Sequence, residues 1–384
     1  MSTLDTRALH DGEPSPLIEG AVSLPIFQTA TYAHEEDELV RYVRLNNSPN
    51  HKALHEKLAS LTRTDDARVT ASGMAAISST LLSLLEAGDH LVSPPTLYGG
   101  TLGFLDTILP RFNIDHSALP DGGPDAWSDA LTPDTKVLYA ESITNPMLEV
   151  PDLEAMVSFA DAHDLVTVID NTFASPVNLR PAELGIDVVL HSATKYLAGH
   201  SDVAAGVVAG PSSLLEAVDE TLTLTGGMLD PHACFLLHRS LKTLGVRMRR
   251  QNRTGQAVAE ALTSHDAVRQ VHYPGLASHP NYDRAQRLFE GTGGMVTFEL
   301  ASDADPQQFL SALTLPIQAP SLGGVESLIT RPAHTSHKDM APEARRAQGI
   351  TDRLIRLSVG LEDPDDLCPD LTQALDASRQ SSPA

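Results

Sequence analysis

Cysteine and lysine are scarce in this sequence, and long hydrophobic runs are missing. The two cysteines, Cys234 and Cys368, lie far apart and match no metal or redox spacing. No apolar stretch approaches the length of a transmembrane helix, and the polar residues 1–13 contain no apolar signal core. We therefore expect a protein of the reducing cytoplasm that does not enter a membrane.

Acidic residues greatly outnumber basic ones. The formal net charge of -23 at pH 7 argues against nucleic acid or an anionic membrane as a partner, because both bind basic patches. Only six lysines occur, and two of them, Lys52 and Lys57, are expected to be solvated on a helix that begins near His51. A salty cytoplasm and a GC-rich genome that favours arginine explain the lysine scarcity equally well.

Short apolar strands alternate with helices through much of the chain. Continuous apolar runs such as 136–140 and 165–169 are typical of buried parallel strands. Together with the helices between them, they predict an α/β fold whose mostly parallel sheet is covered on both faces. We expect an extended arm over residues 1–50, a large domain over 51–245 and a smaller C-terminal α+β domain over 246–384.

Polar residues follow several of these strands directly. Ser72, Asn145, Asp170 and Ser192 each come just after a predicted strand. Ligands of open parallel sheets bind at the carboxyl ends of the strands, so we expect these residues to face one crevice. Ser72 also precedes a predicted helix, and the free N–H groups of such a junction can bind a phosphate. A simple N-cap serine is the plainer interpretation of this junction.

The most informative lysine lies in the stretch 187–201. Lys195 follows the apolar run 188–190 and is flanked by Ser192 and Thr194. Desolvation at the mouth of a buried strand favours a neutral amine, which can form a Schiff base, and the hydroxyls can hold a phosphate. This combination indicates pyridoxal phosphate (PLP). For Lys195 in isolation, a surface lysine after a core strand is the better interpretation. The choice between this and a Schiff-base lysine therefore depends on residues elsewhere in the chain.

A PLP enzyme also needs an acid against the pyridine nitrogen, a phosphate cup and a carboxylate clamp. Asp170 ends an apolar strand and suits the first role, although alone it is equally well a turn aspartate. Tyr98 offers a flat face for stacking on the ring. Arg356 is a guanidinium inside an apolar strand and is costly to bury without a carboxylate, such as that of an amino-acid substrate. The candidates for the phosphate cup are Ser72, Gly73, Met74, Ser192 and Thr194.

With these residues the chain resembles the PLP-dependent Cys/Met metabolism (transsulfuration) family, which includes cystathionine γ-synthase, cystathionine γ-lyase and methionine γ-lyase. The resemblance extends from residue 25 to residue 363, and the lysine motif at 187–201 is its most specific part. It implies a PLP-dependent transferase fold of type I (aspartate aminotransferase-like) with a mostly parallel seven-stranded sheet. It also implies a homotetramer, a dimer of tight dimers.

The resemblance further implies residue roles. Lys195 matches the Schiff-base lysine, Asp170 matches the partner of the pyridinium, and Tyr98 stacks on the ring and exchanges protons with the substrate or leaving group. Tyr42 and Arg44 match a Tyr-x-Arg motif that reaches the phosphate in the neighbouring subunit. The residues that match positions for the substrate carboxylate are Asn145, Ser321 and Arg356.

The implied reaction is elimination or replacement at the γ-carbon of an amino acid. Three positions depart from the cystathionine-handling pattern, in which polar groups bind the distal end of that substrate: Arg41, Gly103 and Pro320. No cysteine stands near the motifs where methionine γ-lyases have one. We predict a carbon–sulfur lyase, with γ-replacement on an activated homoserine as the alternative, because Arg41 suits an anionic substrate.

Two hypotheses that assign the chain to other functional classes have less support. A catalytically silent PLP carrier has no support, because every catalytic position is filled. A zinc hydrolase using His334 and His337 lacks helical i, i+4 spacing and a nearby acid. We therefore predict no metal site.

Overall fold

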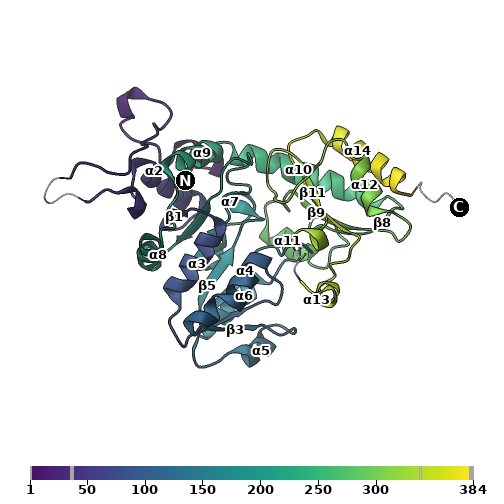
Figure 1. The fold of residues 1–384 in the computed structure, drawn as a ribbon, viewed down its shortest axis with the longest axis horizontal. Helices are drawn as coiled ribbons and strands as arrows, with labels where there is room; N and C mark the ends of the chain where they lie inside the picture. The colour runs from purple at the N-terminus through teal and green to yellow at the C-terminus, as the bar shows by residue number, and fades with distance from the viewer. Residues whose placement is uncertain (1, 35–38, 337, 339, 380–384) are drawn as a thin grey trace. The chain divides into compact units, whose positions relative to one another are not determined.

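A computed structural model describes residues 2–34, 39–336, 338 and 340–379 (Figure 1). The chain divides into two compact units. The first comprises Met1–Ser142, Pro151–Ala198 and Asp202–Gly245, and the second comprises Ile143–Val150, Gly199–Ser201 and Val246–Ala384. Two short segments, at 143–150 and 199–201, thus group with the C-terminal half of the chain although the sequence gives no sign of it. No described helix is long and apolar enough to span a bilayer.

The first unit combines one sheet with surrounding helices. Its strands are β1 (Asp66–Thr70), β2 (His90–Ser93), β3 (Asp115–Ala118), β4 (Thr135–Glu141), β5 (Val166–Asp170), β6 (Val188–His191) and β7 (Gly206–Gly210). Its helices are α1 (Leu4–His10), α2 (Pro49–Thr62), α3 (Gly73–Leu84), α4 (Gly99–Thr107), α5 (Pro124–Trp127), α6 (Leu153–Ala162), α7 (Ser175–Asn178), α8 (Ser212–Thr225) and α9 (Pro231–Leu241).

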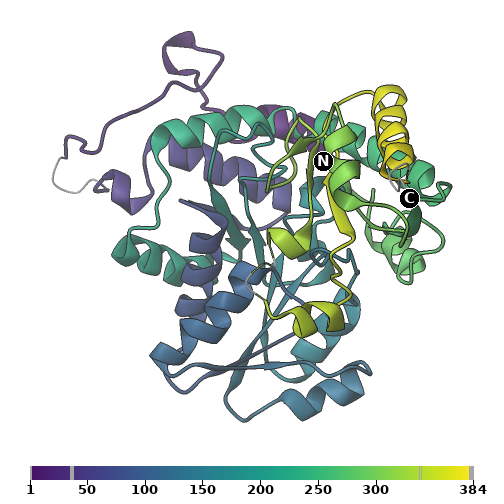
Figure 2. The ribbon, with the colours of Figure 1, turned by 45° about the vertical axis from the view of Figure 1, so that its right-hand side comes forward.

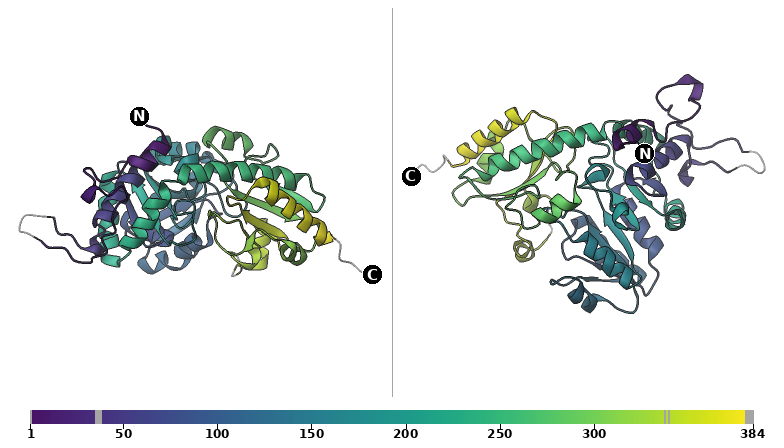
Figure 3. Two further views of the ribbon diagram at one scale, coloured as in Figure 1. Left: turned by 90° about the horizontal axis from the view of Figure 1, so that it is seen from above. Right: turned by 180° about the vertical axis from the view of Figure 1, so that it is seen from behind.

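The sheet of the first unit has seven strands in the order β1-β7-β6-β5-β4-β2-β3. Strands β2 to β6 run parallel, and β7 runs antiparallel to both of its neighbours, β1 and β6. Figure 1 and the view from behind in Figure 3 show the sheet from opposite sides. The expected α/β fold with a mostly parallel seven-stranded sheet is confirmed.

Apolar side chains fix the helices on this sheet. Residues two apart on a strand share a face, so Val137 and Tyr139 of β4 point to the same side, together with Val168 of the neighbouring strand. These three pack in one cluster with residues of α3, α4 and α8. Because the strands are parallel, β4, β5 and β6 all end at the same edge. Their last residues are Glu141, Asp170 and His191.

The second unit is built around a five-stranded sheet in the order β10-β11-β12-β9-β8. Its strands are β8 (Val268–His272), β9 (Met295–Leu300), β10 (Ile317–Gln318), β11 (Leu328–Thr330) and β12 (Leu354–Ser358). Its helices are α10 (Leu244–Thr263), which begins at the end of the first unit, α11 (Tyr282–Leu288), α12 (Pro306–Ala312), α13 (Pro342–Ala347) and α14 (Pro364–Arg379). Side chains of α10, α12 and α14 pack on Phe298 and Leu357 of the sheet, and Figure 2 brings this unit forward.

The prediction that Lys57 is solvated is wrong. Its side chain is fully buried on α2, where Nζ donates a hydrogen bond to the carbonyl oxygen of Ala8 at 2.8 Å. Nζ also lies 3.2 Å from a carboxylate oxygen of Glu13, and the same oxygen lies 2.8 Å from Nζ of Lys242. The cause is α1, a helix within a segment expected to be extended, which packs on α2 and covers Lys57. A buried ammonium requires such a partner.

Replacing Lys57 by methionine should lower the free energy of unfolding by about 2 kcal/mol, because Glu13 keeps Lys242 but loses its buried partner. Denaturant unfolding of the PLP-loaded protein measures the change. The matched control is Lys52→Met on the exposed side of the same helix, which should change it by less than about 0.5 kcal/mol. Equal changes in the free energy of unfolding of the two variants would contradict the role assigned to the ion pairs of Glu13 with Lys57 and Lys242.

Candidate active site

The N-terminus of α3 is joined to the turn after β6 by close packing. Ser72 is the N-cap of α3, and its hydroxyl oxygen accepts a hydrogen bond from the Ala75 N–H at 3.1 Å. A Cβ atom on Gly73 would lie 2.8 Å from the Cβ of Ser192, so only glycine allows this approach. The free N–H groups of a helix of 12 residues therefore lie beside the hydroxyl of Ser192.

Hydrogen bonds hold the lysine turn in a defined shape. The Ser192 N–H donates to the hydroxyl oxygen of Thr172 at 2.7 Å, and the Lys195 N–H donates to the carbonyl oxygen of Ser192 at 3.1 Å. The hydroxyl of Thr194 accepts from the Ala205 N–H at 3.0 Å and lies 3.2 Å from the carbonyl oxygen of the same residue. Lys195 is half-buried at the end of this turn.

Asp170 ends β5, one strand over from β6. Its carboxylate accepts a hydrogen bond from the Thr172 N–H at 2.9 Å. Burial raises the pKa of the Asp170 carboxyl, and the hydrogen bonds from Thr172 oppose this rise. A carboxyl in such surroundings is stabilised as the anion by a cationic ligand group.

Tyr98 lies directly before α4, and its side chain is 42% exposed. A Cβ atom on Gly100 would lie 2.5 Å from the Tyr98 ring and 3.0 Å from the sulfur of Met74. The ring therefore lies close to the start of α3, where Met74 is the second helical residue. An exposed aromatic ring beside a polar helix N-terminus is suited to stacking on a flat ligand.

Two residues of this region were not singled out from the sequence. Thr172 links Asp170 to Ser192, because its N–H donates to the Asp170 carboxylate and its hydroxyl oxygen accepts from the Ser192 N–H. Glu141, 6% exposed at the end of β4, accepts a hydrogen bond from the Tyr98 N–H. A charged residue that ends the apolar run 136–140 was the only signal for Glu141.

The proposed substrate-carboxylate residues come together within the second unit. Arg356 is 4% exposed on β12. Its guanidinium donates to the side-chain oxygen of Asn145 at 3.0 Å and to the carbonyl oxygen of Ser321 at 3.1 Å. Ser321 has a φ of 99°, which is a strained value for serine. These contacts fix the orientation of the guanidinium fork, a geometry that suits bidentate binding of a carboxylate.

Tyr42 and Arg44 lie in the N-terminal arm. The guanidinium of Arg44 lies 5.7 Å from the centre of the Tyr42 ring and donates a hydrogen bond to the carbonyl oxygen of Thr223 in α8. Tyr42 is 38% exposed. Their expected contact with a phosphate in a neighbouring subunit stays a prediction.

The residues around Lys195 fit pyridoxal phosphate. The α3 N-terminus and the half-buried hydroxyls of Ser72 and Ser192 suit a phosphate, because they supply donors and a positive dipole end. Asp170, whose pKa is raised by burial, suits a protonated pyridine nitrogen. The lysine that would bind the aldehyde is on the same turn as Ser192.

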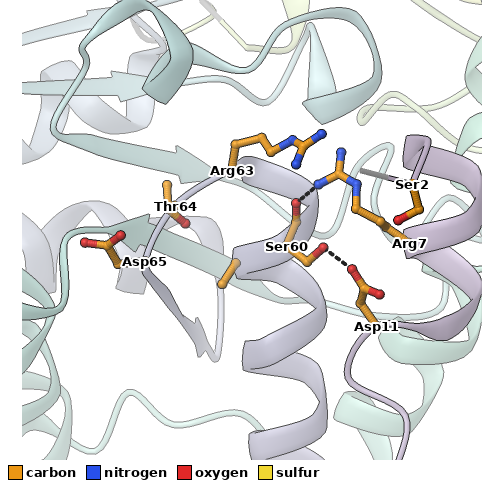
Figure 4. Close-up of a pocket in the computed structure, with 8 residues that line it drawn as sticks. Ser2, Arg7, Asp11, Ser60, Arg63, Thr64 and Asp65 are labelled. Carbon is orange, nitrogen blue, oxygen red and sulfur yellow. Dashed lines mark hydrogen bonds between the residues drawn. The ribbon is translucent and has the colours of Figure 1, made fainter.

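A pocket of ≈ 430 Å³ lies elsewhere in the first unit (Figure 4). There Arg7 donates to the carbonyl oxygen of Ser60, whose hydroxyl donates to Asp11. It contains none of the predicted site residues. The described residues include no group of three or more His, Cys, Asp or Glu able to hold a metal ion, and His337 lies outside the described residues.

Comparison with known proteins agrees with this chemistry. A model of the family described as "Cys/Met metabolism PLP-dependent enzyme" matches residues 5–376. A cystathionine beta-lyase of Lactococcus lactis subsp. cremoris is 40% identical over 98% of this chain and 100% of the relative. An L-methionine gamma-lyase of Pseudomonas putida is 40% identical over 97% of each chain.

A solved structure is also similar over almost the whole chain. The cystathionine gamma-lyase of Lactobacillus plantarum, complexed with L-serine, superposes with a TM-score of 0.94 at 37% identity, covering 98% of this chain and 100% of the other. These similarities extend over almost the entire chain and include both units. The protein belongs to the Cys/Met metabolism family of PLP-dependent enzymes.

Proposed function

We propose that the protein is a PLP-dependent carbon–sulfur lyase that catalyses α,γ-elimination, and also α,β-elimination, of a sulfur amino acid such as cystathionine or methionine. Water is consumed, and a 2-oxo acid, ammonia and a thiol are released. The observation that supports it most is the packing of the Ser192–Lys195 turn against the N-terminus of α3, beside Asp170. The lyase names of relatives that cover the full chain point to the same reaction class.

Lys195 has two tasks in this proposal. Its amine would hold the cofactor covalently between turnovers, and Nζ would accept the proton from the substrate α-carbon. The turn that carries Lys195 is fixed by backbone hydrogen bonds, so its amine returns to one position. Pyridoxal phosphate, when bound, supplies an electron sink that stabilises negative charge at the substrate carbons.

Other residues of this chain bind and orient. The phosphate would be held by Ser72, Gly73, Met74, Ser192 and Thr194. Asp170 would pair with the ring nitrogen, and Tyr98 would stack on the ring and give a proton from its phenol to the leaving thiolate. Arg356, aligned by Asn145 and Ser321, binds the α-carboxylate of the substrate.

The second candidate function is γ-replacement, in which a thiol adds in place of the leaving group. Arg41 is exposed and suits an activated homoserine with an anionic substituent. A Cβ atom added at Gly103 would meet nothing within 4 Å, so there is open space at the position where cystathionine-handling members of the family often have an arginine. Arg41 and Gly103, with Pro320, are the positions at which the two functions differ.

The proposals for assembly and location rest on the resemblance to the family. We propose a homotetramer, a dimer of dimers, in which Tyr42 and Arg44 of one copy reach the phosphate bound by its neighbour. The exposed ring of Tyr42, with Arg44 beside it, supports this role. The proposed location is the cytoplasm, where both cysteines stay reduced.

Replacing Lys195 by alanine should abolish the covalent, borohydride-trappable adduct with PLP, because the amine that forms it is gone. Mass mapping of the trapped peptide measures this. Lys136→Ala, an exposed lysine on β4, is the control and should trap as the wild type does. Trapping at Lys242 or Lys338 instead would refute the assignment of Lys195.

A substrate panel separates the two functions. The PLP-loaded protein is incubated with cystathionine, methionine, cysteine, and O-acylhomoserine plus a thiol, and 2-oxobutyrate, pyruvate and thioethers are assayed. We expect 2-oxo acids from the sulfur amino acids without added thiol. Thioether as the main product indicates γ-replacement. No turnover of any substrate despite bound PLP would contradict both functions.

A further inference from the structure

Glu141 is a buried carboxyl to which the proposed mechanism gives no task. It is the last residue of β4 and 6% exposed. No ion pair with Glu141 is found among the described residues. An uncompensated acid in the interior is costly, so its position at the edge that carries Asp170 calls for an explanation.

Glu141 is tied to Tyr98 by a hydrogen bond. The backbone N–H of Tyr98 donates to Glu141 Oε1 at 2.5 Å. Tyr98 is the N-cap of α4, and no side chain caps that helix from its own N-cap position. Glu141 therefore ties the start of α4 to the end of a central strand. Strand β4 is paired with a strand on each side and is therefore a rigid support for the loop before α4.

Glu141 and Asp170 are neighbours on the sheet. They are paired in register at the ends of the parallel strands β4 and β5, so their side chains lie on the same face. Burial, and next the negative charge of Asp170, raise the pKa of Glu141 to about 8, against the effect of the Tyr98 N–H. Tyr139, two residues earlier on the same face, is fully buried, and burial and both carboxylates raise its pKa.

This arrangement keeps one charge rather than two beside the ring-nitrogen position. A pKa raised to about 8 favours the protonated form of Glu141 at neutral pH, so the carboxyl of Asp170 faces less negative charge from its neighbour. The acceptor Oε1 is available to the Tyr98 N–H in either state of Glu141, since a carboxylic acid retains a carbonyl oxygen. Glu141 can thus hold Tyr98 without competing with Asp170 for a cation.

We propose that Glu141 is a positioning residue that fixes the backbone of Tyr98 and so aligns its phenol ring with the cofactor and the leaving group. The inference rests on the proposed function, because Glu141 acts through Tyr98. The rival explanation is that Glu141 only stabilises α4. Both explanations predict a less stable protein after substitution, so stability alone does not separate them.

The test compares three substitutions in the PLP-loaded protein. Glu141→Leu removes the acceptor, and Glu141→Asp withdraws it by one methylene while keeping the carboxyl. Both should lower kcat about 100-fold, the scale of a misplacement of a reacting group by about 1 Å, with little change in KM. Glu141→Gln should restore most of the loss, because its amide oxygen can accept the same Tyr98 N–H. The visible circular-dichroism band of bound PLP should change in the Leu and Asp variants and not in Gln.

The same substitutions in a Tyr98→Phe background complete the cycle. If Glu141 acts through the phenol, the Leu and Asp changes should cost much less kcat there than in the wild type. Equal losses in both backgrounds, a Gln variant as poor as Leu, or an unchanged dichroism band would each overturn the proposal. If Tyr98→Phe alone leaves kcat unchanged, the role proposed for Tyr98 fails. The dichroism band then still decides whether Glu141 places the ring.

Discussion

The candidate site depends on one close approach, that of the α3 N-terminus to the turn after β6. There is no room at Gly73 for a side chain, because a Cβ would lie 2.8 Å from Ser192. This contact puts the unpaired N–H groups of a helix beside two hydroxyls and the turn of Lys195. Gly206 permits a second close contact here, because a Cβ at this position would lie 2.2 Å from the carbonyl oxygen of Ser72. Glycine at both positions permits the close packing on which the proposed phosphate site depends.

The parallel strands supply the rest of the site at one edge. β4, β5 and β6 end side by side, and their final residues include two carboxyls in register, Glu141 and Asp170. Two neighbouring acids in a buried place cannot both be ionised cheaply. Each acid has its own hydrogen-bond donor, the backbone N–H of Tyr98 for Glu141 and that of Thr172 for Asp170. Asp170 can then face a cationic ligand, while Glu141 holds the loop before α4.

Much of the first unit could be predicted from the sequence, because buried parallel strands are continuous apolar runs and their carboxyl ends mark the site. Asp170, Ser192 and Lys195 were singled out as candidates in this way, and their roles stay predictions. In the second unit the predicted strand that carries Arg356 is β12, whereas the short strands β10 and β11 were missed, since two or three residues leave no periodic pattern. Lys57 was misjudged because its burial depends on α1, a distant segment, and not on its own helix. Glu141 was missed because a charged residue at the end of an apolar run does not reveal which backbone N–H it accepts from.

The most direct test of this account is the affinity of the protein for PLP after Gly73→Ala. The added methyl group should force α3 away from Ser192 and weaken PLP binding about 5- to 150-fold, the scale that corresponds to about 1–3 kcal/mol of overpacking. The control is Gly103→Ala on α4, where a Cβ meets nothing within 4 Å and affinity should be kept. Equilibrium dialysis measures both, with far-ultraviolet circular dichroism to show that the fold is intact. If the folded Gly73→Ala variant binds PLP as tightly as the wild type, the site is not built on this contact.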